Sequence, residues 1–252
     1  MSSNNYSPEH KARELLHSFG ILKPPINPYN ICSRLNIKIS HAYFDKANAF
    51  FTLKNGVKEI ILNHSINYSL REKFTIAHEI GHYWLNHGQI TACPTSDIMN
   101  YESNEKIELE ADRFAAELLM PSFTFAEDVD KLPLSIRSFK ILAKKYKTSL
   151  TSTAIKFIEN TKFPGAIFLS SNGKISLKFK SNKFNYTLRH NDELNPHSYA
   201  YDYFIRNIDP PNAPVRVCSD AWLDDENAFH SFTEHSFPYR NFNQVLTLIQ
   251  HN

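Results

Sequence analysis

The sequence predicts an α+β protein whose two halves are joined by a helical segment. Two Asn-Gly pairs, Asn55-Gly56 and Asn172-Gly173, lie between short apolar runs, and each predicts a β-hairpin because this dipeptide tolerates the positive φ values of a tight turn. Between the two hairpins, apolar residues recur at helical spacing. We therefore expect a domain of helices and a small sheet over residues 1–125, a basic helical segment over 126–162, and a smaller α+β domain over 163–252.

The composition is that of a folded protein. Of the 252 residues, 42% are hydrophobic and 21% are charged, which excludes a disordered chain. No apolar run approaches the ~20 residues needed to span a bilayer, so no membrane association is expected. Residues 1–6 lack the pattern of a signal peptide, and the three cysteines (Cys32, Cys93 and Cys218) are too scattered for a disulfide framework. These features predict a cytoplasmic protein.

The first part of the chain predicts two helices and three strands. Ser7 and Pro8 have the residue types of a helix N-cap and first turn, and Gly20 marks the end of that helix. The other elements expected here are a short helix over 29–35, a strand over 37–44, and hairpin strands over 50–53 and 59–62.

The next predicted helix contains the motif His78-Glu79-Ile80-Gly81-His82. Ser69 and Glu72 fit a capping box at its start, and Gly88 predicts its end. Glycine in mid-helix costs roughly 1 kcal/mol relative to alanine, so Gly81 predicts close packing against this turn. The expected buried face consists of Leu70, Phe74, Ala77, His78, Gly81 and Leu85.

The motif has the residue types and spacing of a metal site. His78 and His82 are four apart, so both imidazoles project from one side of the helix, where a single tetrahedral zinc ion can bind both. Glu79 is placed to take a proton from a metal-bound water. A purely structural interpretation, with two histidines in a core, would also have to bury the Glu79 carboxylate, which is costly without a partner.

A third ligand is expected from outside the motif. A three-histidine arrangement would need histidine at position 88, which is Gly88, so a glutamate from the next predicted helix, 104–121, is favoured. Glu108 lies ~65° and Glu110 ~95° from the centre of that helix's apolar stripe. Asp112, one turn after Glu108, can accept the N–H on the far side of a ligating imidazole. We favour Glu108 and keep Glu110 as the alternative.

Other side chains near the motif have less defined roles. Cys93, in the polar loop predicted over residues 89–103, could approach a metal as a thiolate, although a loop cysteine with no role is the simpler interpretation. His87 is expected to cap the helix or to back a ligand. Tyr83, Tyr101 and His87 are all candidates for stabilising an oxyanion.

Two segments carry a resemblance to a known family. Residues 71–82 (REKFTIAHEIGH) and 108–121 (ELEADRFAAELLMP) resemble the ImmA/IrrE metallopeptidases, and the likeness extends over roughly residues 8–160. The resemblance implies a gluzincin-like zinc metallopeptidase domain. It also implies a bacterial or phage cytoplasmic endopeptidase that cuts a helix-turn-helix repressor and thereby derepresses stress-response or mobile-element genes.

The resemblance also assigns roles to individual residues. It makes His78, His82 and Glu108 the ligands of one Zn²⁺ per chain, and Glu79 the catalytic base. Asp112 stands where family members often have asparagine, a conservative change for accepting an imidazole N–H. An extended substrate could bind as an added strand along the loop over 89–104 or along the edge of the first hairpin.

A different function is predicted by the charge distribution. Residues 131–162 contain eight basic residues and one acid, a net charge of +7, in a protein whose net charge is +2. Helices expected over 134–146 and 152–158 have the outline of a helix-turn-helix, although their apolar positions equally fit packing beneath a domain. The alternative is therefore a DNA-binding transcriptional regulator with a vestigial zinc site.

In the last domain, where a sensory or regulatory role is expected, strands over 166–169 and 174–179 form the second hairpin, and 245–249 is a helix or strand.

Overall fold

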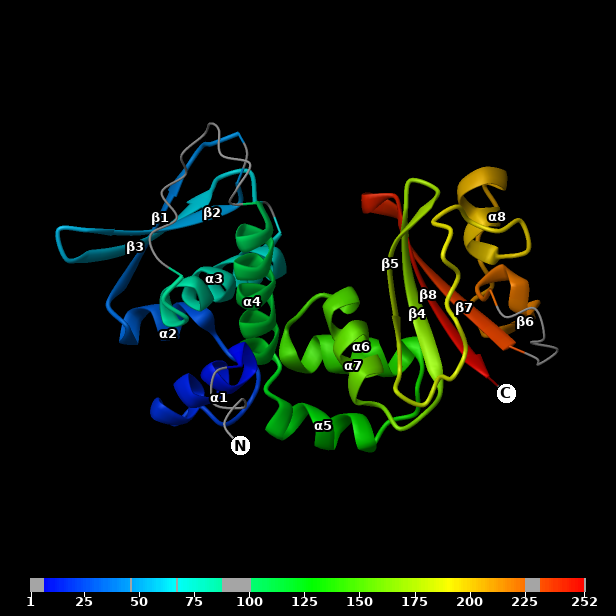
Figure 1. Cartoon of the computed structure of the whole chain (residues 1–252), viewed down its shortest axis with the longest axis horizontal. Helices are drawn as coiled ribbons and strands as arrows, with labels where there is room; N and C mark the ends of the chain where they lie inside the picture. The colour runs from blue at the N-terminus through cyan, green and yellow to red at the C-terminus, as the bar shows by residue number, and fades with distance from the viewer. Residues whose placement is uncertain (1–6, 46, 67, 88–100, 225–231, 252) are drawn as a thin grey trace. The chain divides into compact units, whose positions relative to one another are not determined.

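A computed structural model places two compact α+β units (Figure 1). The first unit comprises Met1–Phe125 with Lys145–Ser149, and the second comprises Ala126–Lys144 with Leu150–Asn252. The α+β class is confirmed, whereas the functional boundaries expected at residues 125 and 162 stay predictions. The structure describes residues 7–45, 47–66, 68–87, 101–224 and 232–251, with only the backbone of 101–104.

The first unit follows the expected order of elements and ends in a further helix that was not predicted. The hydroxyl of Ser7 accepts a hydrogen bond from the backbone N–H of His10, and Gly20 has φ +63°, so the first helix begins and ends as predicted. The elements are α1 (Pro8–Ser18), α2 (Pro28–Arg34), β1 (Ile37–Ala42), β2 (Ala49–Lys54), β3 (Val57–Asn63), α3 (Ser69–Trp84), α4 (Tyr101–Leu119) and the further helix, α5 (Ser122–Asp130), which continues into the second unit.

A three-stranded sheet packs against α3. Its strand order is β1-β3-β2, with β1 parallel and β2 antiparallel to β3. Asn55 and Gly56, at φ +51° and +78°, form the predicted turn between β2 and β3. This order leaves β2 at one edge of the sheet, next to α3.

Helix α3 is present, but its start and its buried face differ from the prediction. Tyr68 is the N-cap and makes no side-chain capping bond, and Ser69, the expected cap, already lies in the helix. The Glu72 carboxylate accepts a hydrogen bond from the Tyr29 hydroxyl. A tertiary hydrogen bond therefore takes the place of the expected capping box. Since α3 contacts both α4 and β2, it is buried on more than one side. Its buried positions are Thr75, Ile76, Ala77, Glu79, Ile80, Gly81 and His82. Ala77 and Gly81 are buried as predicted, whereas the other four positions of the expected face are only partly buried: Leu70, Phe74, His78 and Leu85.

Helix α3 also ends earlier than Gly88, which lies outside the described residues. Asn86 adopts a left-handed conformation at φ +60°. Its N–H donates to the Tyr83 carbonyl at 3.3 Å, and the His87 N–H donates to the His82 carbonyl at 3.1 Å. This pair of bonds is a Schellman motif, and it turns His87 back beside the helix.

Helix α4 packs closely on α3. It begins at Tyr101, so the expected loop over 89–103 is partly helical, and its residues 89–100 lie outside the described part of the chain. A Cβ on Gly81 would lie 3.1 Å from Phe114 Cδ1 and 3.3 Å from the Cα of Ala111. The expectation that Gly81 allows a close approach is confirmed.

The second unit contains an antiparallel five-stranded sheet in the order β5-β4-β8-β7-β6. Asn172 and Gly173 form the predicted second hairpin, at φ +52° and +83°. The segment over 245–249 is strand, not helix. The elements are α6 (Ile136–Tyr146), which ends in the first unit, α7 (Leu150–Asn160), β4 (Gly165–Ser171), β5 (Lys174–Lys180), α8 (Tyr199–Arg206), β6 (Val215–Val217), β7 (Phe232–Tyr239) and β8 (Gln244–His251).

Helices cover both faces of this sheet. Gly165 of β4 lies against Ile158 of α7, whereas Ala166, which points to the opposite face, belongs to the core that contains Ala200 of α8. Figure 1 shows α7 and α8 on the two sides of the sheet. The sequence prediction did not include α8.

Candidate metal centre

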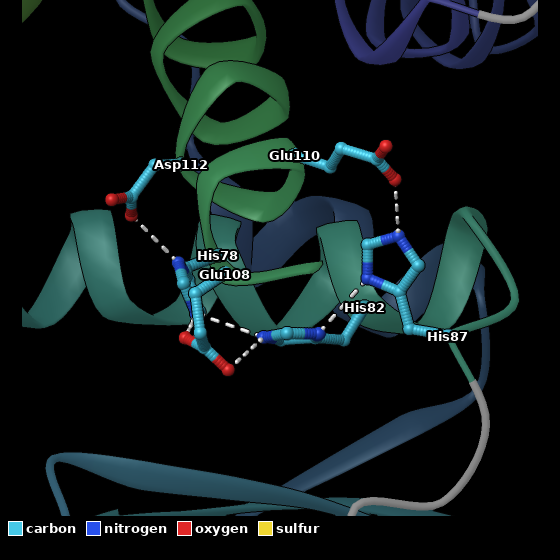
Figure 2. A network of polar contacts seen from close by, with 6 residues as sticks. All are labelled: His78, His82, His87, Glu108, Glu110 and Asp112. Atoms are coloured by element: carbon cyan, nitrogen blue, oxygen red, sulfur yellow. Dashed lines mark hydrogen bonds and ion pairs between the residues drawn. The ribbon is translucent and has the colours of Figure 1, made fainter. Parts of the chain in front are cut away.

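Three side chains from α3 and α4 converge on one point (Figure 2). His78 Nε2 lies 2.9 Å from His82 Nε2 and 3.0 Å from Glu108 Oε2, and His82 Nε2 lies 3.4 Å from Glu108 Oε1. Among the described residues, these three form a group of potential ligand atoms that all lie within 4.8 Å of one another. The structure therefore brings together the three residues expected to bind metal.

The donor set suits a tetrahedral ion. A zinc ion bound at ~2.0–2.1 Å separates its ligand atoms by about 3.3 Å, close to the three distances between these atoms. Two imidazole nitrogens that face each other at 2.9 Å compete for one proton unless a cation lies between them. Two nitrogens and a carboxylate, with a fourth position left open, are the usual ligands of a catalytic rather than a structural zinc site.

Each imidazole of the group also makes a contact through its other nitrogen. His78 Nδ1 lies 2.9 Å from Asp112 Oδ1, the placement expected from the sequence. His82 Nδ1 lies 3.1 Å from His87 Nδ1, and His87 Nε2 lies 3.2 Å from Glu110 Oε2. Glu110, the alternative ligand, thus contacts His87 and is not part of the converging group.

The electrostatics of the group reflect these contacts. Burial opposes protonation of His78, but its hydrogen bonds to Asp112 and Glu108 outweigh that effect and raise the pKa of His78 to about 9. Hydrogen bonds with the two imidazoles hold the pKa of the Glu108 carboxyl well below its usual range. Burial lowers the pKa of His87. The site therefore combines the Glu108 carboxylate, which stays ionised, with the His78 imidazole, whose positively charged form is favoured.

Glu79 lies beside the group and is only 8% exposed. Burial raises the pKa of its carboxyl, and the backbone N–H of Phe51 donates a hydrogen bond to it. Glu79 lines a cavity of about 490 Å³ together with the His-His-Glu group. The cavity is also lined by residues 47–51, at and just before the start of the edge strand β2.

The other candidates from the sequence are less well placed. Tyr83 packs its ring against Phe51 at 5.2 Å and beneath the Lys58 ammonium at 4.8 Å. Neither Tyr83 nor His87 belongs to the described lining of the cavity. The described part of the structure does not include residues 89–100, among them Cys93, or the side chain of Tyr101. The sequence indicated the edge of the first hairpin only as a place for an extended substrate, and the structure adds that β2 of this hairpin lines the same cavity as Glu79.

An α+β domain that places an H-E-x-x-H helix beside a glutamate-bearing helix, around one cavity, is a metallopeptidase-like domain. The family model of the IrrE N-terminal-like domain, a metal-dependent peptidase family, matches residues 32–157. This match covers half of the chain, which therefore belongs to that family. The resemblance noted in the sequence is confirmed.

Two further similarities extend the comparison. The chain is 31% identical over 102 residues to a protein of Bacillus phage phi105 described as uncharacterized immunity region protein 2, covering 40% of this chain and 63% of that relative. A solved structure described as a Mycobacterium tuberculosis transcriptional regulator is also similar, and the match covers 98% of this chain and 77% of that protein's chain. The TM-score is 0.59 and the sequence identity is 14%, so the similarity shows a shared fold. No described helix is both long and apolar enough to cross a membrane.

Proposed function

We propose that this protein is a zinc-dependent endopeptidase that acts in the cytoplasm on a helix-turn-helix transcriptional repressor and thereby derepresses stress-response or mobile-element genes. The observation that carries the proposal is the convergence of His78, His82 and Glu108 beside the buried Glu79, in one cavity. Family membership supports the peptidase activity. The immunity-region description of the phage relative supports a regulatory substrate.

The chain's own residues account for each part of the proposed hydrolysis. His78, His82 and Glu108 would hold one zinc ion, which when bound lowers the pKa of water and polarises a carbonyl. Glu79 takes the proton of the attacking water and delivers it to the leaving amine. The hydrogen bond from the Phe51 N–H fixes the carboxylate of Glu79 on the cavity wall.

The edge strand β2 offers a place for an extended substrate. Asn48 directs its carbonyl to the N–H of Asn63, at 2.8 Å, so by alternation Ala49 and Phe51 direct their backbone groups away from β3. Because the Phe51 N–H donates to Glu79, an added strand would pair with the N–H and carbonyl of Ala49 and with the carbonyl of Phe51. Both residues line the cavity that contains Glu79. A linker of the repressor could therefore bind as an added strand with its scissile bond beside the His-His-Glu group.

Incubation of the zinc-loaded protein with the repressor encoded beside its gene tests the proposal, and we expect cleavage at one site. Glu79→Gln should retain zinc and lose cleavage, whereas Glu108→Ala should lose zinc occupancy. Glu105→Gln, at an exposed position of α4, is the matched control and should behave like the native protein. Cleavage by the Glu79→Gln protein would refute the mechanism.

The alternative function, DNA binding by a regulator with a vestigial zinc site, is favoured by one arrangement. Helices α6 and α7 follow each other closely, across a turn in which Lys147 has φ +54°. However, Phe157 of α7 is fully buried against Phe139, and Lys140 lies 3.7 Å from the centroid of the Phe237 ring. These contacts fit packing better than a recognition helix. Salt-dependent binding to duplex DNA would support this function, and no binding at low salt would dismiss it.

A further inference from the structure

The two imidazoles that face the proposed metal are supported in different ways. Behind His78 lies the carboxylate of Asp112, at 2.9 Å. Behind His82 lies a second imidazole, that of His87, at 3.1 Å between the two Nδ1 atoms. Glu110 lies behind His87, at 3.2 Å, so a carboxylate of α4 is reached in both cases (Figure 2).

We infer that His87 and Glu110 are positioning residues that hold His82 in the tautomer and orientation needed to bind metal through Nε2. This inference rests on the proposed zinc-dependent function. It assigns a role to Glu110 that differs from the ligand role of Glu108 on the same helix. It also makes α4 the source of the metal-binding carboxylate and of the carboxylates that support both imidazoles.

The positions of the protons follow from the geometry. A metal at His82 Nε2 requires the lone pair of that atom, so the His82 proton must reside on Nδ1. It can then be donated to His87 Nδ1, which must be unprotonated to accept it. The remaining proton of His87 lies on Nε2, where it is donated to the Glu110 carboxylate. Every donor in this chain of contacts has an acceptor, and each imidazole is neutral.

The arrangement is held by the backbone as well as by side chains. The His82 and His87 side chains are only 5% and 7% exposed. The His87 N–H donates to the carbonyl of His82 itself, and Asn86 provides the left-handed turn that makes this bond possible. His87 is thus bound to His82 at two points. Lys106 lies 3.9 Å from Glu110 and adds only an exposed ion pair.

Zinc affinity, measured by competition with a chromophoric chelator, tests the inference. Loss of groups that orient a ligating histidine typically weakens metal binding ~10- to 100-fold, and we expect this range for His87→Phe. His87→Gln should recover most of the affinity, because its carbonyl can accept from His82 while its amide donates to Glu110. Glu110→Gln should give a smaller loss. Lys106→Gln, which removes only the ion pair, is the matched control and should bind zinc like the native protein.

A spectroscopic measurement separates positioning from a general effect on folding. In the ¹⁵N-labelled, zinc-loaded native protein, a scalar coupling between His82 Nδ1 and His87 Nδ1 across their hydrogen bond is expected, and Lys106→Gln should preserve it. Absence of this coupling in the native protein, or native zinc affinity in both His87→Phe and Glu110→Gln, would overturn the inference. If His87→Phe does not fold, Glu110→Gln and the coupling decide. A native protein that binds no zinc would instead refute the proposed function.

Discussion

Gly81→Ala tests whether the close contact of α3 and α4 forms the site. A Cβ at position 81 would lie 3.1 Å from Phe114 Cδ1 and 3.3 Å from both Cα and O of Ala111. Phe114 is fully buried, and the Ala111 atoms belong to the backbone, so the contact is relieved only if the helices separate. Glu108 lies one turn before Ala111, so this separation would also displace a proposed ligand.

The magnitude follows from two opposed effects. Alanine in mid-helix gains roughly 1 kcal/mol over glycine. Inserting a methyl group into a packed interface costs ~1–3 kcal/mol. Because two of the three contacts are to backbone atoms, we place the cost in the upper half of that range, and expect Gly81→Ala to lower the free energy of unfolding by about 1–2 kcal/mol. Zinc affinity should fall as well.

Hydrogen exchange measured by mass spectrometry as a function of urea checks this, because peptides from α3 and α4 report the first unit separately from the second. Phe114→Leu in the same chain should recover only part of the loss, because it relieves one contact and leaves the two to Ala111. A Gly81→Ala protein that is as stable as the native one, with unchanged zinc affinity, would refute the reasoning.

Two further predictions concern a turn and a buried acid. Asn86 has a left-handed conformation, so Asn86→Gly should change the free energy of unfolding by only a few tenths of a kcal/mol. Asn86→Val should lower it by ~1–2 kcal/mol and weaken zinc binding by displacing His87. Equal urea midpoints for the two variants would contradict this. Glu234→Gln should lower the free energy of unfolding by about 1–3 kcal/mol near pH 4. The two carboxyl oxygens of Glu234 accept from the Trp222 ring N–H and from the Ala200 backbone N–H, so either orientation of a glutamine amide would place its NH2 donor against one of these donors. Burial raises the pKa of Glu234, so the folded protein keeps this proton to higher pH than the unfolded chain does. The free energy of unfolding of the native protein therefore falls as pH rises above the usual range of a glutamate, and its difference from that of Glu234→Gln becomes smaller. Urea unfolding followed by Trp222 fluorescence measures the two free energies of unfolding. A difference between the native protein and Glu234→Gln that grows with pH would contradict the argument.

Local patterns in the sequence were sufficient for the features that depend on periodicity. The spacing of His78 and His82, and the position of Glu108 relative to the apolar stripe of its helix, predicted side chains that the structure gathers at one point. Both Asn-Gly hairpins form for the same reason, because a two-residue turn fixes its own backbone conformation.

Features that depend on a partner from elsewhere in the chain were not predictable in this way. Ser69 and Glu72 have the residue types of a capping box, but the Tyr29 hydroxyl binds Glu72 and the helix begins one residue earlier. Part of the cavity lining comes from β2, whose position at the sheet edge follows from pairing β1 with β3. No short window of sequence contains either relationship.

The face of α4 separates Glu108 from Glu110, and the end of α3 explains where Glu110 makes its contact. At ~100° per residue, Glu108 and Glu110 point to nearly opposite sides of their helix, whereas Asp112 returns to within ~40° of Glu108. One helix face can therefore supply only Glu108 and Asp112 to the paired imidazoles. Glu110 reaches the site because the Schellman motif after α3 carries His87 round to the other flank of α4 (Figure 2). Glu108 is therefore the glutamate that we propose as a ligand, and the left-handed turn that brings His87 to Glu110 lies outside what helical periodicity can predict.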